Sequence, residues 1–242
     1  MMKRLSIPHA MATAAVVALC TPALAQEEDR SGANRGQVDE AVTGPAAKIA
    51  LAHDLYAIGT AEEDALAVAT AARLLASVAE EDGAEAPRSE TRALETGAPE
   101  GAVADPSEGS VATSDEMFAK AVELAQAGED PALAELIVDL AAEGNRGSVH
   151  YVKSWGSSLS PGWYEEFYIT FHGQEFAEVA IIGEGRSVLD LTVYDENGNV
   201  ICTDYRDWDQ AYCSWTPKWT GEFTVVVSNE GYYSNNFVVV TN

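Results

Sequence analysis

The sequence predicts an α+β protein of several parts, in which small α-helical hairpins or a bundle precede a C-terminal antiparallel β-sandwich with a jelly-roll-like arrangement. Two observations lead to this fold class. Before residue 147 the only aromatic residues are Tyr56 and Phe118, whereas all five tryptophans follow it. Apolar residues recur at helical spacing in the first region and alternate at strand spacing in the second. Regions of such different composition are not expected to share one core.

The first 25 residues have the form of a secretory signal peptide. Two basic residues precede a short apolar run, and Ala23-Leu24-Ala25 is an A-x-A cleavage site. The apolar run is shorter than the roughly 20 residues that a membrane-spanning helix needs. Cys20 leaves a lipoprotein as the alternative, although Leu19 stands where a lipid-attachment motif requires a small residue. We therefore expect an exported chain, periplasmic or secreted, without stable membrane insertion.

The net charge narrows the classes of partner. The chain carries 39 acidic and 14 basic residues, a formal charge of −25. Nucleic acids are polyanions, so a nucleic-acid partner is excluded. An anionic membrane surface is disfavoured for the same reason. Strong acidity favours solubility and contact with divalent cations.

The region before the β-sandwich predicts two helical hairpins. Residues 26–44 are polar and glycine-bearing, which indicates disorder. Residues 45–79 follow as the first hairpin, in which Gly59 is expected to end one helix. Thr60 and Glu63 then form a capping-box pattern that starts the next helix.

A second hairpin is predicted at 114–144, with a break at Gly128. Residues 80–113, between the hairpins, lack periodicity and predict a disordered linker. Both hairpins follow the order helix, glycine, acidic cap, helix, which is a faint repeat. Tetratricopeptide-type arrays use such a unit but need about three copies. We expect a bundle or a hairpin pair that acts as a spacer or an interaction element.

Residues 147–242 predict the β-sandwich, because short apolar/polar alternations recur without helical stretches between them. Tyr168 and Thr170 are expected on the outward side of their strand, and Asp190, Thr192 and Tyr194 on the outward side of theirs. The run from 235 to 242 is apolar almost throughout. The residues expected to face inward are Phe167, Ile169, Phe171, Ala177, Val179, Ile181, Leu189, Leu191, Val193, Phe223, Val225 and Val227.

The stretch Asp195-Glu196-Asn197-Gly198-Asn199 separates two of these strands. Asn-Gly is a strong signal for a tight hairpin, because both residues tolerate a positive φ. An EF-hand loop is excluded, since Val200 follows Asn199 where that pattern requires glycine. A plain turn explains the stretch, and contact with a cation through Asp195, Asn197 and Asn199 remains the alternative.

The run LDLTVYDENGNVIC, followed by SWTPKWTGEFTVVVSN and FVVVTN, resembles the bacterial pre-peptidase C-terminal domain. The resemblance covers about residues 150–242. It implies a jelly-roll-like β-sandwich of the kind appended to exported proteins, and related domains in secreted collagenases bind collagen and use calcium. Calcium is thus the one cofactor implied, with Asp190 joining the candidates Asp195, Asn197 and Asn199. Val188 occupies the place of the family's first aspartate, which weakens that implication.

No catalytic signature is present. His53, His150 and His172 lie in no zinc or triad spacing, and His53 is expected on the surface of its helix. No pair of carboxylates stands out as a glycosidase pair. We therefore expect no enzyme activity, with a small hydrolytic or hydrolase-associated protein kept as the last alternative.

A binding role has a candidate loop. Cys202 and Cys213 are the two cysteines left after signal removal, and in an exported chain they predict a disulfide. The loop between them holds Tyr205, Arg206, Trp208 and Tyr212, which we identify as candidate ligand-binding residues. Packing of these aromatics over the sandwich edge is the alternative.

The function favoured by the sequence is non-catalytic binding or adhesion to an envelope or extracellular polymer or protein. The first alternative is an envelope assembly protein that acts through its helices.

Overall fold

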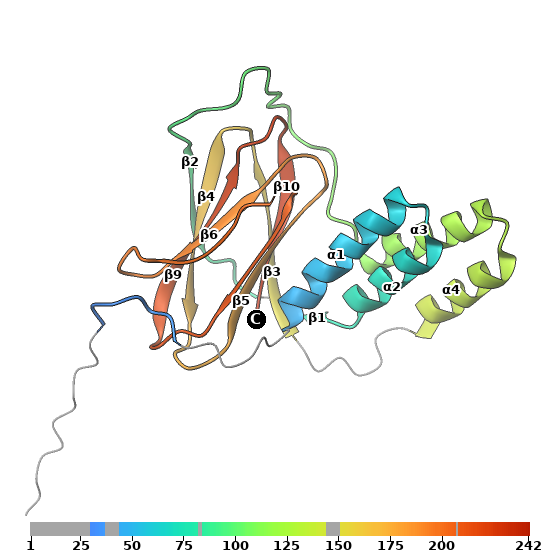
Figure 1. The fold of residues 1–242 in the computed structure, drawn as a ribbon, viewed down its shortest axis with the longest axis horizontal. Coiled ribbons are helices and arrows are strands. Elements are labelled where there is room, and N and C mark those ends of the chain that lie inside the picture. Colours follow the sequence, from blue (N-terminus) through green and yellow to red (C-terminus); the bar gives the residue numbers. More distant parts are fainter. Residues whose placement is uncertain (1–29, 37–43, 82–83, 144–150, 207) are drawn as a thin grey trace, which may run out of the picture.

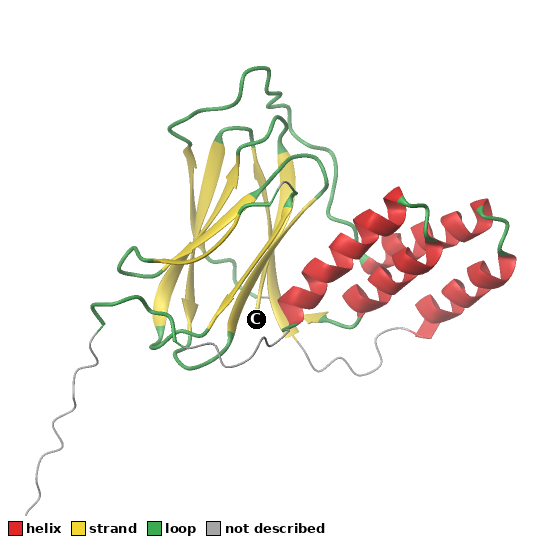
Figure 2. Cartoon of the chain, viewed as in Figure 1, coloured by secondary structure: helices red, strands yellow, loops and turns green. Residues whose placement is uncertain are grey.

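The computed structural model describes residues 30–36, 44–81, 84–143, 151–206 and 208–242 (Figure 1). The predicted signal peptide and its cleavage site lie outside these residues. Figure 2 shows a helical part packed beside a β-sandwich, which confirms the predicted α+β fold class. No helix among the described residues is long and apolar enough to cross a membrane.

The four helices pack as successive neighbours. They are α1 (Pro45–Ala61), α2 (Ala65–Ala76), α3 (Ser114–Ala127) and α4 (Pro131–Glu143). Both hairpin turns place a glutamate at positive φ, Glu63 and Glu129, directly before an aspartate. Asp64 then accepts hydrogen bonds from the first amides of α2, and Asp130 does the same for α4. The faint sequence repeat is therefore a structural one.

One helix boundary differs from the prediction. Helix α1 continues through Gly59 and Thr60, and α2 is capped by Asp64. Gly59 is buried in the α1–α2 contact, where an added Cβ would collide with Val68 and Ala67. The glycine thus allows two helices to approach closely, and does not end the first one.

Two five-stranded sheets form the sandwich, with orders β1-β3-β10-β5-β8 and β2-β4-β9-β6-β7. The inward residues predicted from alternation are buried between them. The strands are β1 (Ala79–Glu80), β2 (Arg88–Ala93), β3 (Tyr151–Leu159), β4 (Trp163–Phe171), β5 (Ala177–Gly183), β6 (Asp190–Tyr194), β7 (Val200–Asp204), β8 (Gln210–Trp215), β9 (Gly221–Asn229) and β10 (Asn235–Thr241).

The stretch predicted as a disordered linker, residues 80–113, contains β2, and β1 spans its boundary with the predicted first hairpin. Strand β1 pairs in parallel with β3, and β2 pairs antiparallel with β4 over its whole length. All side chains of β2 are exposed, so its sequence carries no apolar alternation. Charged edge strands of this type protect a sheet against further pairing. Because they are polar throughout, their sequences do not show the apolar alternation that predicts a strand.

The N-terminal stretch 26–44 was also predicted to be disordered, and its described part 30–36 is docked on the sandwich. Asn34 is fully buried. Its side-chain oxygen accepts from the amides of Lys218 and Trp219, and its side-chain nitrogen donates to the carbonyl of Trp219. Its backbone amide donates to Asp195 at 2.8 Å. Asn34 is thus a main anchor of the segment, together with Arg35 and Gly36, which donate to the carbonyls of Ile201 and Thr216. Composition does not reveal such tertiary hydrogen bonds.

Helix α1 covers the outer face of one sheet. Ala46, Ile49 and Ala50 pack on Ala180 and Ile182 of β5, together with apolar residues of β3 and β10. This cover explains why β5 is buried on both faces and why Val238 and Val240 of β10 are apolar. The outer face of the β2-β4-β9-β6-β7 sheet has no helix packed against it among the described residues.

Candidate functional site

The predicted disulfide is confirmed. Cys202 of β7 is bonded to Cys213 of β8, and the two strands belong to different sheets. Cys213 lies in the sandwich core and Cys202 packs against it. The bond therefore ties the edges of the two sheets together at the base of the loop that carries the candidate binding residues.

Replacing both cysteines with alanine is expected to lower the free energy of unfolding by about 2 to 3 kcal/mol, because the bond removes loop-closure entropy from the unfolded chain. Urea denaturation of the double variant and of the wild type measures the difference. Equal midpoints with and without the bond would contradict this expectation.

The four candidate binding residues do not form one surface. Tyr205 is 64% exposed and lies over the open sheet, where its hydroxyl is 2.7 Å from the Thr192 hydroxyl. Trp208 is 57% exposed but lines a cavity beside α1. The loop thus sends its two exposed aromatics to opposite sides of the sandwich.

The other two candidates are engaged within the chain. The Arg206 guanidinium donates hydrogen bonds to both carboxylate oxygens of Asp204. Tyr212 packs in the cluster beneath α1, and its hydroxyl donates to the buried Glu178 at 3.0 Å. Burial raises the pKa of the Tyr212 phenol, which keeps it a donor. Both residues support the fold around the loop.

A groove of about 660 Å³ lies on the open face, beneath Tyr205. Strand pairing explains its composition. Ser228 of β9 is paired with Tyr164 on one side and Asp190 on the other. Val226 is likewise paired with Glu166 and Thr192. The groove residues are Leu94, Tyr164, Glu166, Asp190, Thr192, Tyr194, Tyr205, Val226, Ser228 and Glu230.

Three tyrosines of this groove come from separate elements: Tyr164 from β4, Tyr194 from β6 and Tyr205 from the loop after β7. They surround carboxylates and hydroxyls, so the groove offers flat apolar rings beside hydrogen-bonding groups. Glu166 accepts from the Tyr168 hydroxyl at 3.0 Å, which fixes its carboxylate at the groove. Such an arrangement suits a neutral, hydroxyl-rich ligand with flat faces.

Sequence reasoning identified Tyr205 but not Tyr164 or Glu166 as members of a site. The outward positions of the strands contained the signal, since Asp190, Thr192 and Tyr194 all follow the predicted alternation. The missing information was which strands are neighbours, because β4 and β6 meet only through β9.

Residues 195–199 form the hairpin turn between β6 and β7, and the carboxylate of Asp195 holds this turn together. Asp195 is 3% exposed, and its two oxygens accept from the amides of Asn34, Asn197 and Asn199 and from the Asn199 side chain. Burial opposes ionisation of Asp195, but these hydrogen bonds outweigh it and lower the pKa of the carboxyl. Asn197 also donates to the backbone of Arg30.

The four candidate calcium ligands do not converge. Asp190 lies in the groove of the open face, whereas Asp195, Asn197 and Asn199 belong to the turn that holds the N-terminal segment. Among the described residues there is no group of three or more histidine, cysteine, aspartate or glutamate side chains that could hold a metal ion.

These features define the class of this chain: an α+β protein whose disulfide-bonded β-sandwich has one face covered by a helix and the other open. No family model matches the chain, and no curated protein matches it.

Several solved structures are similar to its sandwich. The pre-peptidase C-terminal domain of a Bacillus anthracis collagenase has 10% identity and a TM-score of 0.31, covering 37% of this chain and 88% of that one. The periplasmic inhibitor of g-type lysozyme PliG from Aeromonas hydrophila has 12% identity and a TM-score of 0.28, covering 40% and 90%. TmCBM61, solved with β-1,4-galactotriose, has 14% identity and a TM-score of 0.24, covering 43% and 77%.

Proposed function

We propose that this protein is an exported, non-catalytic binding protein, and that the groove on the open face of its sandwich holds a neutral polysaccharide chain. The observation that carries the proposal is the convergence of Tyr164, Tyr194 and Tyr205 around Glu166 and Asp190, on a sheet face that none of the four described helices covers. Sugar rings stack on tyrosine faces, and their hydroxyls donate to carboxylates.

The charge of the groove selects among polymers. Its ionisable carboxylates are Glu166, Asp190 and Glu230, and the whole chain is strongly acidic. Anionic polymers are therefore repelled, whereas neutral ones are not. The shallow, open form of a sheet face also fits an extended chain better than a compact molecule.

Affinity electrophoresis tests this proposal. Gels containing hydroxyethyl cellulose, xyloglucan, galactan or galactomannan are expected to retard the wild type, and a polygalacturonate gel is not. Tyr205→Ala is expected to weaken retardation roughly tenfold or more, because a central aromatic anchor is lost. Tyr151→Ala is the matched control, since Tyr151 is a 62%-exposed tyrosine on β3 of the other sheet.

Two results would contradict the proposal. One is equal retardation of Tyr205→Ala and wild type. The other is retention of the protein by immobilised collagen or another envelope protein but by none of the neutral polysaccharides.

The alternative function, assembly through the helices, is supported by Leu136 and Val138, which are half-exposed on α4. An oligomer that binds no polysaccharide would favour it.

A further inference from the structure

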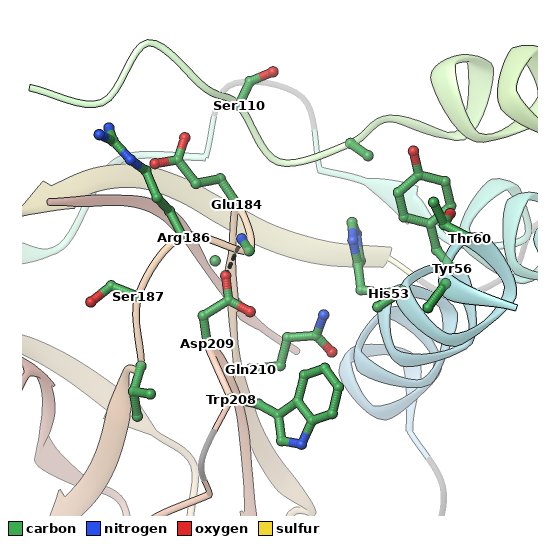
Figure 3. A pocket seen from close by; sticks show the side chains of 16 residues that line it. His53, Tyr56, Thr60, Ser110, Glu184, Arg186, Ser187, Trp208, Asp209 and Gln210 are labelled. Atoms are coloured by element: carbon green, nitrogen blue, oxygen red, sulfur yellow. Dashed lines mark hydrogen bonds between the residues drawn. The ribbon is translucent and has the colours of Figure 1, made fainter. Parts of the chain in front are cut away.

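A second cavity, separate from the open-face groove, lies where α1 meets the sandwich. Its volume is about 660 Å³. Figure 3 shows its walls: His53, Tyr56 and Thr60 project from α1, and Glu184, Arg186 and Ser187 come from the β5–β6 connection. Trp208, Asp209 and Gln210 form the third side, at the start of β8, and Ser110 lies above. Cavities of this size accommodate small-molecule ligands.

Two buried polar atoms on different walls of this cavity lack a protein partner. Gln210 is 7% exposed, and its side-chain oxygen makes no hydrogen bond to any described residue. The same holds for the hydroxyl of Thr60, in the last turn of α1. Each buried unpaired polar group costs roughly 1 to 3 kcal/mol. These two groups offer a ligand in the cavity one acceptor and one hydroxyl.

The remaining polar groups at the cavity are mostly satisfied within the protein. Asp209 accepts from the amide of Gly185, and Glu184 accepts from the amide of Asn236. The Ser187 hydroxyl donates to Asn229. These bonds fix the two loops, so the unpaired groups of Gln210 and Thr60 stand on a pre-formed wall.

The character of the walls defines the ligand class. Trp208 is 57% exposed and presents a large ring at the cavity edge. The charged groups are Glu184 and Asp209 against Arg186, so the balance is acidic and disfavours anions. An aromatic ring beside unpaired amide and hydroxyl groups suits a compact neutral polyol.

We propose that this junction cavity is a binding site for a neutral sugar of one or two residues. Its hydroxyls hydrogen-bond with the Gln210 oxygen and the Thr60 hydroxyl, while one ring face contacts Trp208. This site shares no lining residue with the open-face groove, and it does not depend on the function proposed for that groove.

Isothermal titration calorimetry of the mature protein with glucose, galactose, N-acetylglucosamine, cellobiose and lactose tests the site. Wild type is expected to bind at least one of these sugars. Trp208→Ala and Gln210→Met are each expected to weaken that binding tenfold or more. Tyr151→Ala is expected to bind as the wild type does, and Tyr205→Ala, which alters only the groove, separates failure of one site from failure of the other.

Thermal unfolding of Gln210→Met distinguishes a ligand-binding role from a structural one. Methionine has a similar length and removes the unpaired oxygen, so the melting temperature is expected to stay unchanged or to rise. Loss of sugar binding in a Gln210→Met variant that keeps full stability supports the site. Absence of binding to all five sugars by the wild type overturns the proposal, and so does a Gln210→Met variant that binds normally.

Discussion

Replacing Glu178 with alanine is expected to release α1 from the sandwich and to lower the free energy of unfolding by roughly 3 to 5 kcal/mol. Glu178 of β5 is fully buried and points out of the sheet toward α1. Its two oxygens accept from the first amides of the helix, at Ala46 and Ala47, with distances of 2.9 and 3.2 Å. The Tyr212 hydroxyl adds a third hydrogen bond.

This carboxylate acts as the helix cap that α1 does not supply for itself. Gly44, at the N-cap position, makes no side-chain hydrogen bond, and an added Cβ there would collide with Glu178. A negative charge at a helix N-terminus also interacts favourably with the helix dipole. Alanine removes the acceptor and leaves three donors unpaired in a buried place, which explains the large expected effect.

Urea denaturation measures the loss of stability, and amide hydrogen exchange locates it. Exchange is expected to accelerate in α1 and to change little in β4 and β9, which belong to the opposite sheet. Glu175→Ala, which alters an exposed glutamate near the same strand, is the control. Unchanged protection of residues 45–61 in Glu178→Ala would show that α1 is held by its apolar contacts alone.

His53 is expected to make the protein less stable in mild acid. The sequence predicts this side chain on the helix surface, and that prediction is wrong. His53 is 6% exposed, and it projects from α1 into the wall of the junction cavity. Burial lowers the pKa of its imidazole from 6.5 to about 4. The unfolded chain therefore binds a proton between about pH 6.5 and 4 that the folded chain does not.

Proton linkage determines whether this difference in proton binding raises or lowers the stability as the pH falls. Above pH 6.5 His53 is neutral in both states and has no effect, and stability falls as the pH decreases through this window. The full loss by about pH 4 is on the order of 3 kcal/mol. Burial raises the pKa values of Asp54 and Asp209, which acts in the opposite direction. Wild type and a His53 variant both contain these aspartates, so the difference between the two proteins reports the effect of His53 alone.

His53→Gln is the matched variant, because glutamine is polar and does not titrate. Urea midpoints measured every half unit from pH 7.5 to pH 4 are expected to fall more steeply for the wild type than for the variant. Parallel curves for the two proteins would mean that His53 takes up its proton in the folded state without cost.

The sandwich core could be predicted from the sequence because its strands alternate strictly. Phe223, Val225 and Val227, for example, are all fully buried as their spacing indicates. The disulfide was predictable for a different reason: Cys202 and Cys213 are the two cysteines that follow the predicted signal peptide, so only one pairing is possible. Local signals of this kind do not depend on knowing which strands are neighbours.

The features that could not be predicted from the sequence are those that depend on tertiary contacts. Strand β2 is a polar edge strand, and the segment around Asn34 is held by hydrogen bonds to loops more than 160 positions away in the sequence. The sequence places Tyr205 and Trp208 in one loop, but it does not show that they lie on two sides of the sandwich. Helix α1 lines the cavity that contains Trp208. Its first amides donate to Glu178, and no local pattern marks that glutamate.

The most direct test of the central claim is to map binding on the folded protein by amide chemical shifts. Soluble oligosaccharides of the retained neutral polysaccharide are titrated into labelled wild type. The account predicts shifts concentrated on β4, β6 and β9, around Tyr164, Tyr194 and Ser228, and their absence in Tyr205→Ala. Shifts confined to the helices, with the open sheet face unperturbed, would contradict it.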